Sequence, residues 1–314
     1  MKEKLDFKSS ILIGSLLFGL FFGAGNLIFP VHMGQLAGNN TLQATIGFLI
    51  TGVGLPLLGV IASALSKSES LFDMAKPVNR VYSVLFTCML YLTIGPLFAI
   101  PRTATVAFEV GLSPFIAENY IQIGLIVFSL IFFVVTLYFS LRPGRILDWV
   151  GRYLTPVFLV LLSILLTATF IKPMGQLSQY AAQGNYIDKA LFTGILEGYN
   201  TMDALASLAF AIVIISNIEK LGIKNSKRKA IETFKSGFVC LLGMGIIYAS
   251  LAYMGATSLG SVSRADNGGK IMSMVSEHYF GFIGKVLLAA IVTVACLKTA
   301  IGLITSCSQM FSEM

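Results

Sequence analysis

Long apolar runs separated by short polar segments make up most of the chain. A helix needs about 20 apolar residues to cross a hydrocarbon core of ~30 Å, and eight runs reach span length. The predicted spans cover approximately residues 10–31, 42–65, 81–108, 119–140, 149–171, 191–216, 236–258 and 282–310. The pattern predicts an all-α polytopic membrane protein in which residues 1–314 form a single membrane domain.

Polar and helix-weakening residues interrupt the first run near its centre. Gly23-Ala24-Gly25-Asn26 lies there, and Pro30 follows. Glycine destabilises a helix interior by up to ~1 kcal/mol relative to alanine, and backbone groups freed at this depth must face protein or a wet cavity. This favours a broken helix around a polar ligand. The alternative is close helix packing, because Gly19 and Gly23 are spaced as G-x-x-x-G.

The sixth run carries a comparable interruption. The polar septet Glu197 to Asp203 stands near its beginning, so spans one and six are both interrupted, five spans apart. Paired interruptions in two halves of a chain are typical of inverted-repeat transporters. We therefore predict a first five-helix repeat over residues 1–172 and a partial second repeat of three helices over residues 190–314.

Composition and charge agree with a membrane protein. Apolar residues make up 56% of the chain and charged residues 12%, against ~25% charged in soluble domains. Fifteen basic residues lie before span one and after spans two, four and six, against five in the alternate loops. This bias predicts a multi-pass protein of the inner or plasma membrane with a cytoplasmic N terminus. It also explains the net charge of +7 by topology, without a nucleic-acid partner.

Three stretches resemble a known family. Gly23-Ala24-Gly25-Asn26-Leu27-Ile28-Phe29-Pro30, the segment from Gly95-Pro96 to Thr105, and Ala300-Ile301-Gly302-Leu303 are similar to the bacterial branched-chain amino acid:cation symporters, within the amino acid–polyamine–cation superfamily. The resemblance implies a five-plus-five inverted-repeat fold and uptake of leucine, isoleucine and valine driven by a Na⁺ or H⁺ gradient. It also implies about twelve spans, so the chain is expected to be C-terminally truncated.

The two interruptions supply the candidate substrate site. A helix N-terminus presents free N–H groups that suit a carboxylate, and the C-terminal end of the other half-helix presents carbonyls that suit an ammonium or Na⁺. The candidate substrate-binding residues are Gly23, Ala24 and Gly25 through their backbone, with the side chains of Asn26, Tyr199, Asn200 and Thr201.

Coupling to a cation is assigned to Gly23, Asp203, Lys298 and Thr299. Intramembrane charges are costly and usually functional. The resemblance implies a Na⁺ site where span eight meets the broken first helix, yet Lys298 stands where a hydroxyl residue is expected. Its ammonium would take the ion's place, or else it pairs with an acid such as Asp203. Sodium and proton coupling both stay open, and no cofactor or metal beyond that ion is expected.

Arg102 and Glu109 are predicted to form a structural ion pair, because a separation of seven residues brings them to one face of span three.

The chain lacks a set of nucleophile, base and orienting group, so an enzyme is not expected. The alternative to a working carrier is a truncated, transport-inactive remnant or a membrane-bound sensor.

Overall fold

The computed structural model describes residues 4–66, 68 and 70–313, which form helices and turns without a strand. The α-helices are α1 (Phe7–Phe21), α2 (Ala24–Ala37), α3 (Thr41–Leu49), α4 (Leu55–Ser66), α5 (Leu71–Ala75), α6 (Arg80–Leu92), α7 (Ala99–Val106), α8 (Ile121–Ser140), α9 (Thr155–Ile171), α10 (Ala190–Tyr199), α11 (Asp203–Lys220), α12 (Ser226–Ser258) and α13 (Gly268–Glu313). The all-α prediction is confirmed.

Wider π-helical turns connect several of these helices. Ile50–Gly54 joins α3 to α4, Thr93–Leu97 and Ala107–Leu112 flank α7, and Leu147–Leu154 precedes α9. Each of these segments contains glycine, and Thr93–Leu97 also contains Pro96, which weakens the regular i→i−4 ladder. The turns change which side chains share a face of each long helix.

Both predicted helix breaks are present. α1 ends at Phe21 and α2 begins at Ala24. α10 ends at Tyr199 and α11 begins at Asp203 with a bend of 41°, after Met202 adopts a left-handed φ of 65°. The two polar interruptions read from the sequence therefore mark real ends of helices.

The number of spans differs from the predicted eight. Among the described residues, six helices are long and apolar enough to cross a membrane, or up to seven if the bent pair α10–α11 counts as one span. α1 has only 15 residues because the break ends it early. The stretch Ala24–Ser66 counts once by length, although α2 ends where Gly38 takes a positive φ of 50°.

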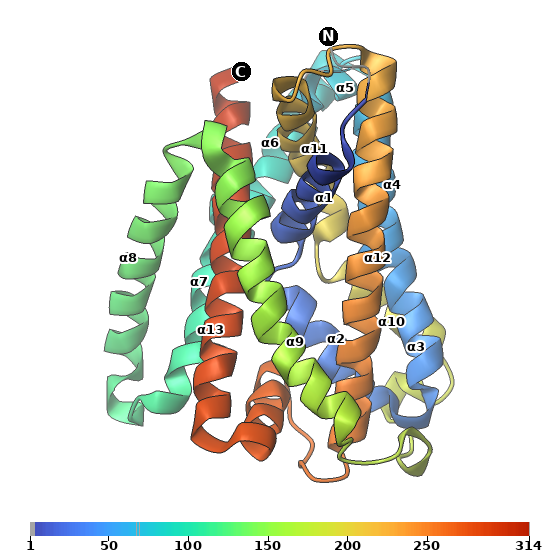
Figure 1. Ribbon diagram of the computed structural model, residues 1–314, viewed down its shortest axis with the longest axis vertical. Helices are drawn as coiled ribbons and strands as arrows, with labels where there is room; N and C mark the ends of the chain where they lie inside the picture. Colours follow the sequence, from blue (N-terminus) through green and yellow to red (C-terminus); the bar gives the residue numbers. More distant parts are fainter. Residues whose placement is uncertain (1–3, 67, 69, 314) are drawn as a thin grey trace.

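The broken helices occupy the centre of the molecule. In Figure 1, α1 and α2 lie between α9, α12 and α13, and α8 stands at the edge. Most large apolar side chains of α1 are buried, whereas α8 exposes many of its own. Exposed apolar side chains on α8 are those that lipid would cover. The described ends of the chain lie at the same end of the bundle (Figure 1).

Close packing of α2 against α12 depends on two glycines. A Cβ at Gly34 would lie 2.0 Å from the carbonyl oxygen of Ala252, and one at Gly255 would lie 2.0 Å from that of Val31.

Gly255→Ala is expected to destabilise the protein by about 1–3 kcal/mol, because the backbones of α2 and α12 must separate. Thermal unfolding in detergent measures this. Gly245→Ala, on the same helix with no atom within 4 Å, is the control, and equal midpoints for the two variants would contradict the prediction.

Candidate functional site

A cavity lies where the two helix breaks meet. Gly23–Asn26 line one side of it and Thr201–Asp203 line another. The space that no atom occupies measures about 560 Å³, including its open mouth. Most of the remaining wall is apolar, from Leu20, Phe21, Ile94, Phe210 and Leu303. The cavity thus combines free helix ends with an apolar wall.

A buried polar network joins the two breaks beside this cavity. Asn26 Oδ1 accepts from the Gly23 N–H at 3.1 Å, and Asn26 Nδ2 donates to Asp203 Oδ2 and to Tyr248 Oη, each at 2.5 Å. Tyr248 Oη also donates to Asp203 Oδ2 at 3.3 Å. Asp203 is only 4% exposed, and as the first residue of α11 it lies where the helix dipole stabilises a negative charge.

Lys298 lies behind the first break. Its side chain is 0% exposed, and its Nζ donates to the carbonyl oxygens of Gly19, at 3.2 Å, and Phe22. In an unbroken helix the N–H of Gly23 would bond the Gly19 carbonyl, but here it bonds Phe21 and Asn26. The ammonium therefore satisfies carbonyls that the break sets free.

Aromatic rings and Thr299 complete the surroundings of Lys298. Its Nζ lies 4.5 Å from the centroid of the Phe158 ring and 5.6 Å from those of Phe18 and Phe22, distances that permit cation–π attraction. A Cβ at Gly23 would lie 3.2 Å from Thr299 Oγ1, which is buried and has no hydrogen-bond partner in the described part of the chain. The structure thus brings Gly23, Lys298 and Thr299 close together.

Comparison with known proteins identifies the family. The model of the branched-chain amino acid transport protein family matches residues 6–314. The chain belongs to this family. It is a transport family and not an enzyme family, and the predicted resemblance is confirmed. With the apolar helices, membership makes this a multi-pass membrane protein.

Several curated members of the family are close relatives. A branched-chain amino acid permease BrnQ of Lactobacillus delbrueckii subsp. lactis is 49% identical, over 100% of this chain and 71% of the relative. The permease BraB of Bacillus subtilis is 48% identical, over 100% of this chain and 70% of the relative. The branched-chain amino acid transport system 2 carrier protein of Pseudomonas aeruginosa is 41% identical, over 97% of this chain and 68% of the relative.

The residues predicted for the sixth span divide into two groups. Thr201 and Asp203 line the cavity, and the Thr201 hydroxyl donates to the Gly198 carbonyl at 2.8 Å. Tyr199 is 50% exposed and Asn200 is also exposed, and neither lines the cavity. Tyr199 and Asn200 end α10 and still follow its helical turn, so only the residues after the bend face the first break.

Arg102 and Glu109 do not pair. No ion pair between them occurs among the described residues, so the predicted structural ion pair is wrong. The π-helical turn Ala107–Leu112 intervenes and rotates Glu109 away from the face that seven residues of regular helix would give it. Arg102 lines the cavity at the breaks, and Glu109 lines a second one.

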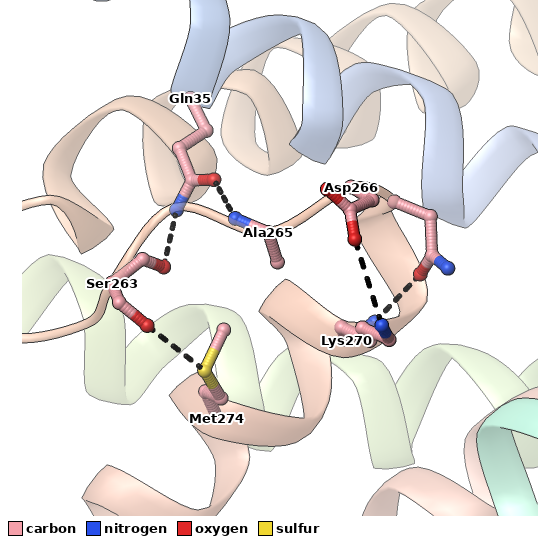
Figure 2. A network of polar contacts seen from close by, with 7 residues as sticks. Gln35, Ser263, Ala265, Asp266, Lys270 and Met274 are labelled. Atoms are coloured by element: carbon pink, nitrogen blue, oxygen red, sulfur yellow. Dashed lines mark hydrogen bonds and ion pairs between the residues drawn. The ribbon is translucent and has the colours of Figure 1, made fainter.

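The second cavity is wider and more polar than the first. Its open space is about 1510 Å³, and its wall includes Glu109, Arg264, Asp266 and Lys270. Figure 2 shows how Gln35 of α2 anchors the loop along its rim: Gln35 Oε1 accepts from the Ala265 N–H at 3.1 Å, and Gln35 Nε2 donates to the Ser263 carbonyl at 3.3 Å.

α2 and the helical stretch around α7 contribute residues to both cavities. Ile28 of the wider cavity follows Gly25 of the narrower one by about one helical turn, and Val106 follows Arg102 in the same way. Successive turns of the same two elements therefore run from one cavity to the other.

Proposed function

We propose that this protein takes up leucine, isoleucine or valine across the inner or plasma membrane by symport with Na⁺ or H⁺. The observation that carries the proposal is the cavity at which both helix breaks meet, the arrangement by which broken helices bind substrate in secondary transporters. The relatives named as branched-chain amino acid permeases support the choice of substrate.

The cavity suits each part of such a substrate. The first turn of α2, which begins at Ala24, offers N–H groups without intrahelical partners to a carboxylate. The Gly23 N–H is already bonded to Phe21 and Asn26. The carboxylate of Asp203, which lines the cavity, suits an ammonium. A branched aliphatic side chain packs on Leu20, Phe210 and the other apolar wall residues, and needs only shape and exclusion of water.

Lys298 is central to the coupling in this proposal. Its ammonium donates to two carbonyls freed by the first break, which are groups that suit a Na⁺ ion in broken-helix transporters. Lysine shifts its proton affinity readily when buried. The ammonium therefore leaves no Na⁺ at the position that it occupies, and Lys298 and Asp203 are the side chains that would carry the proton in H⁺ symport.

The same proposal covers fold and topology. The breaks between α1 and α2 and between α10 and α11 support two inverted repeats, the first over residues 1–172 and a partial second over residues 190–314. The basic residues concentrated before the first and after the second, fourth and sixth predicted spans support a cytoplasmic N terminus.

Uptake into proteoliposomes tests the function. With an inward H⁺ or Na⁺ gradient, the purified protein is expected to concentrate labelled leucine, and an ionophore that collapses the gradient should abolish accumulation. Empty liposomes are the control. Absence of accumulation under both gradients, with monodisperse folded protein recovered from the vesicles, would contradict the proposal.

A further inference from the structure

Arg102 carries a positive charge at the cavity and, among the described residues, is not ion-paired with an acidic side chain. It lines the narrow cavity with Gly25, Asn26 and Asp203 and is partly buried. Its guanidinium carbon lies 5.1 Å from the centroid of the Phe29 ring and 5.8 Å from that of Phe98. These rings hold the guanidinium in place and leave its N–H groups available.

Asp203 does not serve as the missing partner. Its Oδ2 accepts from Asn26 and from Tyr248, and its position at the start of α11 adds the favourable dipole of that helix. Lys298 is likewise engaged, with the Gly19 and Phe22 carbonyls. Of these three charged side chains, that of Arg102 makes no hydrogen bond to another described residue.

The guanidinium also lies against the N-terminal turn of α2. A Cβ at Gly25 would stand 3.3 Å from Arg102 Nη2, so the absence of a side chain there lets the guanidinium reach the helix backbone. The turn that begins at Ala24 presents N–H groups without intrahelical partners. An anion in the cavity can therefore meet a planar fork of donors on one side and a helix N-terminus on the other.

We propose that Arg102 binds the carboxylate of the transported amino acid, together with the first turn of α2. This inference rests on the proposed function and names the group that selects for α-amino acids over uncharged or amine analogues. Two parallel N–H···O bonds fix the carboxylate, and the aliphatic side chain then points toward the apolar wall of Leu20, Phe210 and Leu303.

Leucinamide is the probe that isolates this contact, because it replaces the carboxylate by a neutral amide and keeps the rest of leucine. Binding is read as thermal stabilisation of the purified protein over rising ligand concentration, at pH 6.5, where the amine of both ligands is protonated. The unmodified protein is expected to prefer leucine by roughly 10–100-fold, as charge-assisted bonds imply.

Arg102→Gln is expected to weaken leucine binding by the same roughly 10–100-fold factor and to leave leucinamide binding nearly unchanged, so the preference disappears. Arg102→Lys keeps the charge without the fork and should give an intermediate ratio. The matched control is Arg264→Gln, which removes the same charge from the wider cavity and should keep the ratio of the unmodified protein.

Each outcome decides between the two proposals. If leucine fails to stabilise the unmodified protein, the proposed function is wrong. If leucine and leucinamide bind equally, or if Arg102→Gln keeps the full preference, the function stands and the role of Arg102 is wrong. Should Arg102→Gln not fold, the ratio for Arg102→Lys decides: a lowered preference supports the role, and an unchanged one overturns it.

Discussion

Asn26→Leu is expected to abolish leucine binding, by more than roughly 100-fold, while the protein still folds and inserts. The substitution removes the acceptor of the Gly23 N–H and the donor shared by Asp203 and Tyr248. Each buried partner left unsatisfied costs about 1–3 kcal/mol, and 1.4 kcal/mol corresponds to tenfold in affinity. The cavity would lose its shape, because the Asn26 side chain that links the first helix break to Asp203 and Tyr248 is gone.

Binding of leucine by thermal stabilisation, with size-exclusion profiles for folding, checks this expectation. Asn217→Leu is the matched control: Asn217 is also a buried asparagine, but its amide donates within α11 to the Val213 carbonyl and does not line the cavity. The control should bind leucine as the unmodified protein does. Unchanged affinity in Asn26→Leu would place the substrate elsewhere and leave Gly23-Ala24-Gly25-Asn26 with a packing role only.

Much of the central site is visible in the sequence because membranes penalise polar and flexible residues. Gly23–Asn26 and Glu197–Asp203 are conspicuous within apolar runs, and both coincide with ends of helices in the structure. The same rule singles out Lys298. Close packing, the alternative for the first stretch, holds for Gly19, where a Cβ would lie 2.2 Å from Thr155 Oγ1. Close helix packing therefore explains Gly19, and the helix break explains Gly23.

The remaining errors come from features that a one-dimensional pattern does not encode. Tyr248 belongs to the central network, yet a tyrosine in an apolar run carries no signal of its partner. The ion pair expected for Arg102 and Glu109 assumed a regular helix, which the π-helical turn at Ala107–Leu112 interrupts. Tyr199 lies outside the cavity because α10 continues through this residue and the bend comes only between Tyr199 and Asp203.

Lys298→Thr is expected to make leucine binding depend on sodium. In the unmodified protein the ammonium fills the space between α13 and the end of α1, donating to the Gly19 and Phe22 carbonyls. Threonine removes that charge and adds a hydroxyl beside Thr299, so two carbonyls and two hydroxyls then face a space that suits a small cation. Since coupling between two ligands typically changes affinity 5–150-fold, the leucine affinity of this variant should rise by roughly that factor when Na⁺ replaces a large inert cation.

Lys298→Met is the matched control for this gain. It removes the same charge but supplies no oxygen ligand, so the freed carbonyls lack the fourth ligand and Na⁺ should have no effect on leucine binding. The unmodified protein should bind leucine equally with and without Na⁺, because its ammonium already satisfies those carbonyls. Sodium dependence in the unmodified protein equal to that of Lys298→Thr would show that the ammonium does not take the place of the ion, and the coupling site would have to lie apart from Lys298.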